Sequence, residues 1–377
     1  MSRAQNAAGS TSRPAIGTFA LGAALLLVAA ALDAEPLYVP GVAFTLLALV
    51  TSSWVLLGAR GITVQRRVGE TRVLEDAPLQ IVEEVTAGRM PLPTGVLEDP
   101  LLGSPAPLAT GHRRTRVRIA VRFSRRGRRR LEAPRVVVRD PFGLISRVVR
   151  GGQSHEVLVL PRIEPVHVVV GGGDGLGLGL ARRRQPTLAE VELEGLGPLR
   201  PGTPASRIHW PSIARLAEPQ ERRLHADGDR LPLVLLDPRV EDGPSGARDL
   251  DAAVRATASL AVHLARAGGC LLVLPGDRRP TLIGPTLSGW PRLHARLALV
   301  GGTEPPALGA VAARLGPLVY VSARRIAAAP RTLRHAPGGG RVLVVPDRLR
   351  AVRPVFTVAG CAGHELTASR VARTGAA

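Results

Sequence analysis

A short polar segment, residues 196–215, holds the side chains best suited to specific recognition. Arg207, His209 and Trp210 lie almost side by side in it, and Arg215 follows them. A guanidinium can form two parallel hydrogen bonds to a carboxylate, and an indole can bury its ring while it donates its N–H. His209 would suit a base, yet no partner acid stands near it in the sequence. We therefore predict a rigid joint between two domains here, with a docking surface as the alternative.

Familiar catalytic and metal-binding patterns do not occur elsewhere in the sequence. It contains no lysine, so it lacks a Walker A phosphate loop, and it has no Gly-x-Ser-x-Gly nucleophile elbow. His364 and Glu365 are not followed by the second histidine of a zinc-binding helix. Cys270 and Cys361 lie far apart in apolar runs, which favours two buried thiols. We predict no catalytic residues, no enzyme activity and no cofactor.

The composition limits the class of protein. The chain has 377 residues, of which 45% are hydrophobic and 3% aromatic, and its formal net charge is +20. This length suffices for two domains and a membrane anchor. The charge is carried by arginine and is not interleaved with aromatic residues, so we expect no nucleic-acid partner. The arginine-rich residues 113–130 read as a solvated strand face and a turn, with contact to anionic lipid or another polyanion as the alternative.

Two apolar stretches, residues 15–32 and 37–59, stand near the N-terminus and are separated by Asp33 and Glu35. Each is close to the ~20 residues that cross a bilayer. Arginines flank only their outer ends, and the positive-inside rule then places both chain termini in the cytoplasm. We predict a cytoplasmic tail over residues 1–14, a transmembrane hairpin over 15–60, and cytoplasmic soluble domains. A signal peptide or a pair of buried core helices is the alternative.

Short alternating runs dominate residues 61–165. Apolar residues and arginines alternate from 116 to 123, which is the period of a half-buried strand. The basic residues 125–130 read as a turn, and Asp-Pro-Phe-Gly at 140–143 reads as a second turn. Several short strands at such spacing predict a β-sandwich-like domain.

The second half changes character. Residues 166–230 are rich in glycine, proline and arginine and read as a linker that contains the polar segment. From residue 231 to 362, short apolar runs alternate with amphipathic stretches, of which residues 249–267 form the clearest helix. This pattern predicts a mostly parallel, doubly wound α/β sheet. Residues 363–377 read as a flexible tail. The fold class is therefore α/β plus all-β, behind two transmembrane helices.

Several motifs together resemble the domain-of-unknown-function 58 family. The polar segment matches that family's pattern at Leu196, Pro201, Gly202, Arg207, Ile208, Trp210, Ala214 and Arg215. Gly197, Leu199 and Thr203 stand where the family has arginine, tyrosine and aspartate. The Arg-Arg-Gly run at 125–127 and the Asp-Pro-Phe-Gly-Leu run at 140–144 also match.

The resemblance implies that the C-terminal half is similar to a von Willebrand factor A domain. Such domains often hold Mg²⁺ on Asp-x-Ser-x-Ser after the first strand, because Mg²⁺ prefers hard oxygen ligands. Here that run reads Asp237, Pro238, Arg239, Val240 and Glu241, so both serines are lost. We expect no metal, with Asp237 and Glu241 as residual candidates in a metal-dependent enzyme. The resemblance further implies a MoxR-type AAA+ ATPase as partner, with this chain as its membrane-anchored adaptor in assembly or envelope-related processes.

Overall fold

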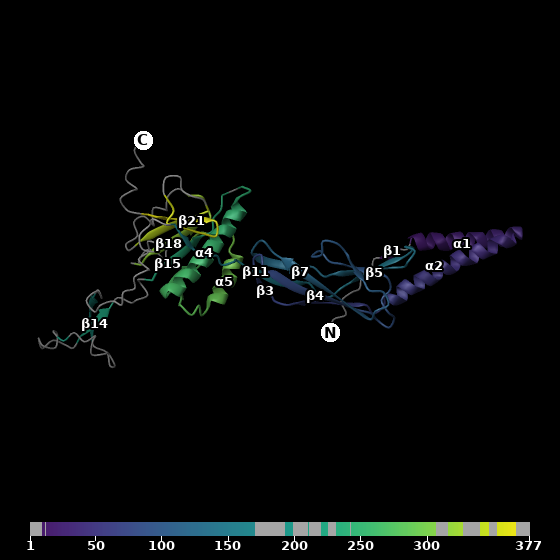
Figure 1. Cartoon of the computed structure of the whole chain (residues 1–377), viewed down its shortest axis with the longest axis horizontal. Coiled ribbons are helices and arrows are strands. Elements are labelled where there is room, and N and C mark those ends of the chain that lie inside the picture. The colour runs from purple at the N-terminus through teal and green to yellow at the C-terminus, as the bar shows by residue number, and fades with distance from the viewer. Residues whose placement is uncertain are drawn as a thin grey trace, which may run out of the picture. The chain divides into compact units, whose positions relative to one another are not determined.

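The computed structural model describes residues 10–11, 13–169, 193–198, 210, 220–224, 231–241, 243–306, 316–326, 340–346 and 353–366. The chain divides into two compact units, Met1–Val159 and Leu160–Ala377 (Figure 1).

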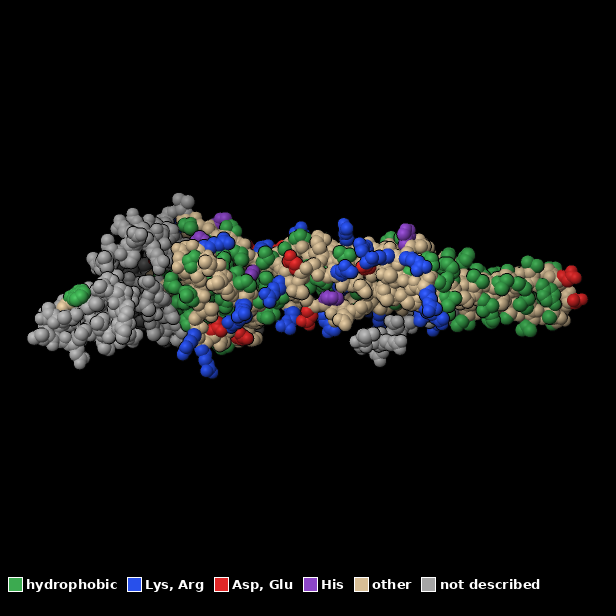
Figure 2. Space-filling model, turned by 90° about the horizontal axis from the view of Figure 1, so that it is seen from below, with side chains coloured by type: hydrophobic (Ala, Val, Ile, Leu, Met, Phe, Trp, Pro, Cys, Tyr) green, Lys and Arg blue, Asp and Glu red, His purple; other side chains and the backbone are tan. Residues whose placement is uncertain are grey.

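Two apolar helices stand at the start of the first unit. Helix α1 spans Arg13–Leu32, helix α2 spans Tyr38–Gly58, and a short 3-10 helix, Glu35–Leu37, joins them. Their most apolar windows have mean hydropathies of 2.3 and 1.8, and only 17% and 28% of these windows are buried. Figure 2 shows the hairpin as an almost uncharged apolar surface. Two helices of membrane-crossing length and composition, with apolar side chains facing outward, fit a membrane protein.

Close packing of small residues joins the two helices. A Cβ atom added at Gly22 of α1 would lie 2.9 Å from the carbonyl oxygen of Gly41 and 2.7 Å from the backbone nitrogen of Thr45, both in α2. Only a residue without a side chain lets the backbones approach this closely, as in many transmembrane helix pairs. The hairpin is therefore held by backbone proximity as well as by apolar contact.

Three antiparallel sheets form the rest of the first unit. Strands β2 (Thr63–Val68), β4 (Pro78–Thr86) and β7 (Arg114–Arg122) make the first sheet, in that order. Strands β3 (Arg72–Leu74), β11 (His155–Leu160) and β8 (Gly127–Leu131) make the second. The third runs β1 (Ser10–Thr11), β10 (Ser146–Arg150), β9 (Arg135–Arg139), β5 (Gly95–Glu98) and β6 (Ala106–Leu108).

One face of the first sheet contributes to two apolar clusters. On β4, Leu79 and Ile81 pack with Leu131 and Val157 of the second sheet. Farther along the same strand, Val85 packs in a cluster that holds residues of the third sheet and of both helices. Because alternate residues of a strand share a face, a single row of side chains ties the sheets to the hairpin.

The arginine pattern of this unit is partly as predicted. The alternation on β7 is confirmed: Ile119 is buried, whereas Arg116, Arg118 and Arg122 are exposed. The prediction of a basic turn over residues 125–130 is wrong, because β8 begins at Gly127 and pairs with β11. The consecutive arginines of β8 do not show the alternation of apolar and polar residues that identifies a strand. The strand is formed through its backbone hydrogen bonds to β11.

An eight-stranded sheet organises the second unit. Its order is β12 (His167–Val168), β20 (Phe356–Val358), β21 (Cys361–Glu365), β19 (Arg341–Val345), β18 (Leu318–Ser322), β15 (Leu233–Asp237), β16 (Cys270–Val273) and β17 (Thr281–Ile283). The four strands β19, β18, β15 and β16 are parallel, and antiparallel strands complete both edges. The sheet is therefore mixed, with a parallel centre. The prediction of a mostly parallel sheet holds for these four central strands only, because β12, β20, β21 and β17 pair antiparallel.

Two helices cover one face of this sheet. Helix α4 spans Gly246–Gly268 and helix α5 spans Trp290–Leu299. Val234 and Leu236 of β15 pack against them, while Leu233 and Leu235 belong to a separate buried cluster on the opposite face. The central strand is therefore buried on both faces, which explains its uninterrupted apolar sequence. The helix that the sequence indicates at residues 307–315 lies outside the described residues.

Two predicted boundaries differ from the structure. The flexible tail was expected from residue 363, but β21 continues to Glu365, and His364 is fully buried in the sheet. A hairpin turn at Ala359 and Gly360, both with positive φ, folds β21 back against β20. Within the expected linker, β13 (Leu193–Pro198) and β14 (Gln220–Leu224) pair as an antiparallel ribbon.

Candidate functional site at the switch point of the parallel sheet

The order of the parallel strands defines one edge where a ligand site would be expected. Among the four parallel strands, β15 comes first in the chain. It lies between β16, which is the next of them in the chain, and β18, which comes later. The connections from β15 and β18 therefore lead in opposite directions along the sheet. In open α/β sheets, ligands bind outside the carboxyl ends of the strands at such a switch point. Asp237 and Ser322 end these two strands and are register partners.

Asp237 is fully buried, and both of its carboxylate oxygens are occupied by donors from the protein. Arg239 donates from Nε to Oδ1 and from Nη2 to Oδ2, each at 2.8 Å. The hydroxyl of Tyr320 on β18 donates to Oδ2 at 2.6 Å. The guanidinium of Arg324 adds a contact of 3.5 Å to the same oxygen. These contacts form a closed charge-paired network of hydrogen bonds at the strand end.

The electrostatics of the network keep the aspartate charged. Burial acts to raise the pKa of the Asp237 carboxyl, but the hydrogen bonds from Arg239 and Tyr320 outweigh it and hold the pKa below the usual value. The bond to Asp237 raises the pKa of Arg239. Burial, followed by the bond to Asp237, raises the pKa of Tyr320. At neutral pH the pair is therefore an aspartate and a guanidinium, with a protonated tyrosine donating to the aspartate.

The residues around the network serve to hold its loops. The Ser322 hydroxyl donates to the carbonyl oxygen of Arg324 and accepts from its N–H, both at 3.1 Å, which folds the loop after β18. Arg325 then pairs with Asp249 in the first turn of α4, at 3.2 and 3.3 Å. The loop after β18 is thus tied both to its own strand and to the start of α4.

This arrangement does not fit a Mg²⁺ site. A cation on Asp237 would have to displace the bidentate guanidinium of Arg239, and the second candidate, Glu241, is exposed to solvent. Among the described residues, no group of three or more His, Cys, Asp or Glu side chains is placed to hold a metal ion. In this arrangement the carboxylate of Asp237 binds the guanidinium of Arg239, which is a structural role.

The polar segment of the sequence lies largely outside the described residues. This applies to Pro201, Gly202, Arg207, Ile208, His209, Ala214 and Arg215. Trp210 is described, and its side chain is 57% exposed, which differs from the expectation of a buried indole in a joint. Strands β13 and β14 pair on either side of these residues in the sequence, with Pro198 opposite Gln220.

The first unit holds a buried ionic triad that the sequence does not suggest. Arg66 of β2 donates from Nε to Glu83 of β4 at 2.5 Å, and it also pairs with Asp99. All three side chains are at most 1% exposed. Burial raises the pKa of the Glu83 carboxyl, against the opposing pull of Arg66. The partners come from separate strands, so only the tertiary structure brings them together.

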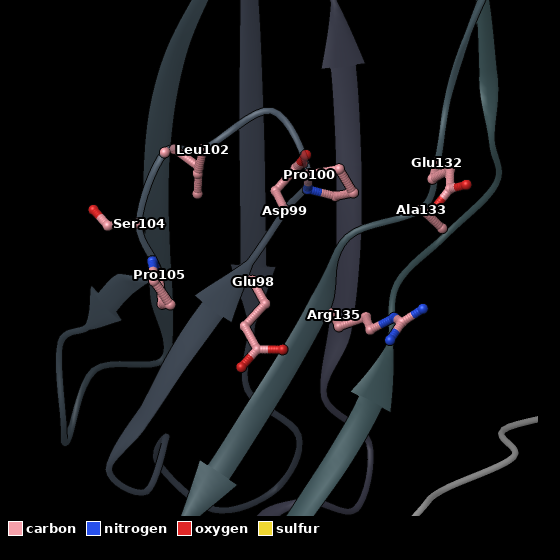
Figure 3. A pocket seen from close by; sticks show the side chains of 10 residues that line it. Glu98, Asp99, Pro100, Leu102, Ser104, Pro105, Glu132, Ala133 and Arg135 are labelled. Carbon is pink, nitrogen blue, oxygen red and sulfur yellow. The ribbon is translucent and has the colours of Figure 1, made fainter.

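A hollow of about 380 Å³ opens next to this triad. Its lining includes Glu98, Asp99, Glu132 and Arg135 (Figure 3). Glu98 and Arg135 are register partners on β5 and β9. Asp99 turns away to bind Arg66 and the N–H of Leu101. Of the acidic side chains in this lining, Asp99 is engaged in the triad, so we assign the hollow no ligand.

The arginines of β7 have partners of their own. Glu84 of β4 is itself buried; it accepts from Arg116 at 3.1 Å and also pairs with Arg114, while Arg67 lies 3.7 Å away. Arg122 donates to the carbonyl oxygen of Asp76 at 2.7 Å. The arginine of each pair is exposed, so solvent screens these contacts. They do account for much of the basic pattern as a strand face.

Comparison with protein-family models gives no match to this chain, and comparison with curated proteins gives none.

Proposed function

We propose that this chain is a membrane-anchored interaction protein, with the two apolar helices as its anchor and the second unit as its interaction module. The observation that carries the proposal is the closed network at Asp237. Doubly wound domains keep their reactive carboxylates open at the switch point, whereas here both oxygens are taken by Arg239, Tyr320 and Arg324. The strand end supports the fold, and we assign it no metal-dependent chemistry.

The proposed identity of the module is a divergent von Willebrand factor A-like domain of the domain-of-unknown-function 58 family. The parallel strand order, with the first strand between the second and third, is compatible with such a domain. The loss of both serines after Asp237 fits a domain that has exchanged a metal for an arginine. Interaction then takes place through other surfaces.

The proposed partner is a MoxR-type AAA+ ATPase, and the proposed docking element is the segment that carries Trp210. Exposed tryptophans are rare on protein surfaces but common as anchors in interfaces, because they bury a large area on binding. The 57% exposure of Trp210 supports docking over a buried joint. The role that follows is an adaptor that holds the ATPase at the membrane, for assembly or envelope-related processes.

The proposed orientation places both termini and both folded units in the cytoplasm. Arg13 and Arg60 lie at the outer ends of the hairpin, and Asp33 and Glu35 lie in its connection. Positive residues are retained on the cytoplasmic side of short membrane segments. An ATPase partner in the cytoplasm is compatible with this orientation.

One experiment addresses the adaptor function directly. The full chain is solubilised in detergent from its own cells, captured by an affinity tag, and analysed by mass spectrometry for an AAA+ ATPase. Recovery of such an ATPase at a defined ratio supports the adaptor. Recovery of none, with the chain itself intact and folded, contradicts it.

A second candidate function is attachment to anionic lipid through the arginine-rich residues 113–130. The exposed row Arg114, Arg116, Arg118 and Arg122 favours it. Salt-sensitive binding of the chain to anionic vesicles, lost when Arg118 and Arg122 are changed to glutamine, would support this candidate. Because Glu84 and Asp76 already engage several of these arginines, we rank it second.

A further inference from the structure

The turn between β9 and β10 exposes a phenylalanine on a rigid support. Asp140 is buried, and its carboxylate accepts from the N–H of Phe142 at 2.9 Å and from the N–H of Ile145 at 2.7 Å. Gly143 has a φ of 72°, a conformation that glycine adopts without strain. The ring of Phe142 at the tip is 66% exposed. A turn fixed by buried polar bonds therefore holds an apolar ring in solvent, on a backbone that leaves it little freedom to fold away.

This turn lies at the base of the apolar hairpin. Pro93 packs directly against Gly58 at the end of α2, since a Cβ added to Gly58 would lie 2.5 Å from the Pro93 ring. The next residue, Thr94, accepts from the N–H of Arg139 at 2.8 Å. The end of β9, from which the turn follows, is therefore tied to the end of α2 through Pro93 and Thr94.

The other side of the turn makes contact with the first helix. The carbonyl oxygen of Leu144 accepts from the N–H of Ala15, in the first turn of α1, at 3.1 Å. Ala15, Val55 and Ile145 belong to one buried cluster. The turn is thus packed beside the first turn of α1 and the last turn of α2, where the apolar spans begin.

The same level of the hairpin carries the residues of a membrane interface. Trp54, in the last turns of α2, is 44% exposed. Arg13 begins α1 and Arg60 follows α2, and both are exposed. Aromatic rings and flanking cations gather where the hydrocarbon meets the headgroups. Figure 2 shows arginines collected at the base of the apolar hairpin.

We propose that Phe142 inserts into the headgroup–acyl boundary of the bilayer that the hairpin crosses, and that the Asp140 turn is a third membrane contact beside α1 and α2. This inference rests on the membrane anchor of the proposed function. Three contacts that are not in one line fix the tilt of a domain on a surface, whereas a helix pair alone lets it rock. The turn therefore holds the first unit at a set orientation to the bilayer.

Single-cysteine labelling of the full chain in lipid nanodiscs tests the insertion. An environment-sensitive fluorophore is placed at Phe142→Cys, at Leu27→Cys in α1, where the native side chain is 72% exposed, and at Gln80→Cys on exposed β4 surface. The native Cys270 and Cys361 are buried, and burial raises the pKa of each thiol to about 12, so they react slowly. Depth is read from quenching by spin-labelled lipids and by aqueous iodide.

The three labels separate this inference from the anchor itself. We expect the Leu27 label to be quenched from deep acyl positions, the Phe142 label from shallow lipid positions with an emission shift to shorter wavelength, and the Gln80 label by iodide alone. A Phe142 label that behaves like the Gln80 label, while Leu27 reports hydrocarbon, overturns the insertion and leaves the anchor standing. A Leu27 label quenched by iodide overturns both.

Discussion

The guanidinium of Arg239 holds the carboxylate of Asp237 through two parallel hydrogen bonds of 2.8 Å, at the point where the central strand β15 ends. The two residues are separated only by Pro238, so the loop after the strand folds back on the strand's last side chain. In a protein with an open site, this carboxylate would face a ligand. Here it faces the protein's own cation.

Removing the arginine tests how much the fold depends on this pair. Arg239→Ala removes the guanidinium and leaves the buried carboxylate with Tyr320, Arg324 and the backbone N–H of residue 239, and we expect a loss of about 1–3 kcal/mol in local stability. The loss of stability should lie toward the lower end of this range, because the guanidinium of Arg239 is partly exposed to solvent. Hydrogen-exchange mass spectrometry on the detergent-solubilised chain reads the protection of β15 and β18. Unchanged protection in those strands would show that the pair is not structural.

The pair of Asp237 and Arg239 also predicts that the stability of the fold around β15 falls at acid pH. The folded-state pKa of Asp237 lies below its ordinary value of 3.8, so the charged form stabilises the fold at neutral pH. That contribution persists above the ordinary pKa and is lost as the pH falls below it toward the folded-state pKa. Exchange protection of β15 in the wild type should decline over this acid range. Asp237→Asn should show lower protection at pH 7 and a flatter profile, and equal slopes would contradict the assignment.

The triad in the first unit predicts losses of stability of different size from two substitutions. Arg66→Met leaves Glu83 and Asp99 buried without a cation, which should cost about 3–5 kcal/mol. The pKa of Glu83 is raised from 4.5, so its ionisation opposes folding as the pH rises from that value through the folded-state pKa. Glu83→Gln should therefore be far milder than Arg66→Met at pH 7. Exchange protection of β2 and β4 measures both, and equal losses would refute the charge balance.

The hairpin contains a matched pair of glycines. A Cβ at Gly22 would meet the backbone of α2 within 2.9 Å, whereas a Cβ at Gly17 meets nothing within 4 Å. Gly17→Ala should leave the helix pair intact, since alanine favours helix by about 1 kcal/mol. Gly22→Ala should push the helices apart and lower the melting temperature in detergent, followed by the fluorescence of Trp54 in a chain whose Trp210 and Trp290 are changed to phenylalanine. If the two variants melt alike, the close crossing is wrong.

The last strand has a similar test. A Cβ at Gly363 would lie 2.4 Å from the buried ring of Phe356, whereas Gly284 has open space around its Cα. Gly363→Ala should cost about 1–3 kcal/mol through overpacking, with lost exchange protection in β19 and β21, and Gly284→Ala should be mild. Wild-type protection in Gly363→Ala would contradict the close contact between Gly363 and the Phe356 ring.

The membrane orientation is open to direct labelling. Asp33→Cys lies in the connection between the helices and Gln80→Cys lies on β4, and in sealed cells an impermeant thiol reagent should reach the former only. Broken membranes should expose both. Labelling of Gln80→Cys in intact cells would reverse the orientation.

The sequence predicts the elements well where periodicity is strong. The helix expected over residues 249–267 is present as α4, and the strand expected around Ile119 is present as β7. Both are predictable because an element that buries one face has apolar residues at a regular spacing. Strand β8 is not recognisable in the sequence, because its consecutive arginines at 128–130 show no alternation and the strand is held by backbone pairing. Strand β21 is not recognisable either, because Gly363 packs against a ring and so adds no apolar side chain to the pattern. The arginine after Asp237 does signal a closed site, but Tyr320 and the Arg66 triad become visible only when distant strands meet.

We propose that this chain recruits an AAA+ ATPase to the membrane through the segment that carries Trp210. The most direct measurement is quantitative capture of the full-length chain from its own cells, with Trp210→Ala compared with Leu282→Ala, since the native side chains are 57% and 58% exposed. We expect the wild type and Leu282→Ala to recover the ATPase, and Trp210→Ala to recover about tenfold less or lower still, as for an interface anchor worth over 1.4 kcal/mol. Equal recovery by Trp210→Ala, or no ATPase with any of the three folded proteins, would contradict it.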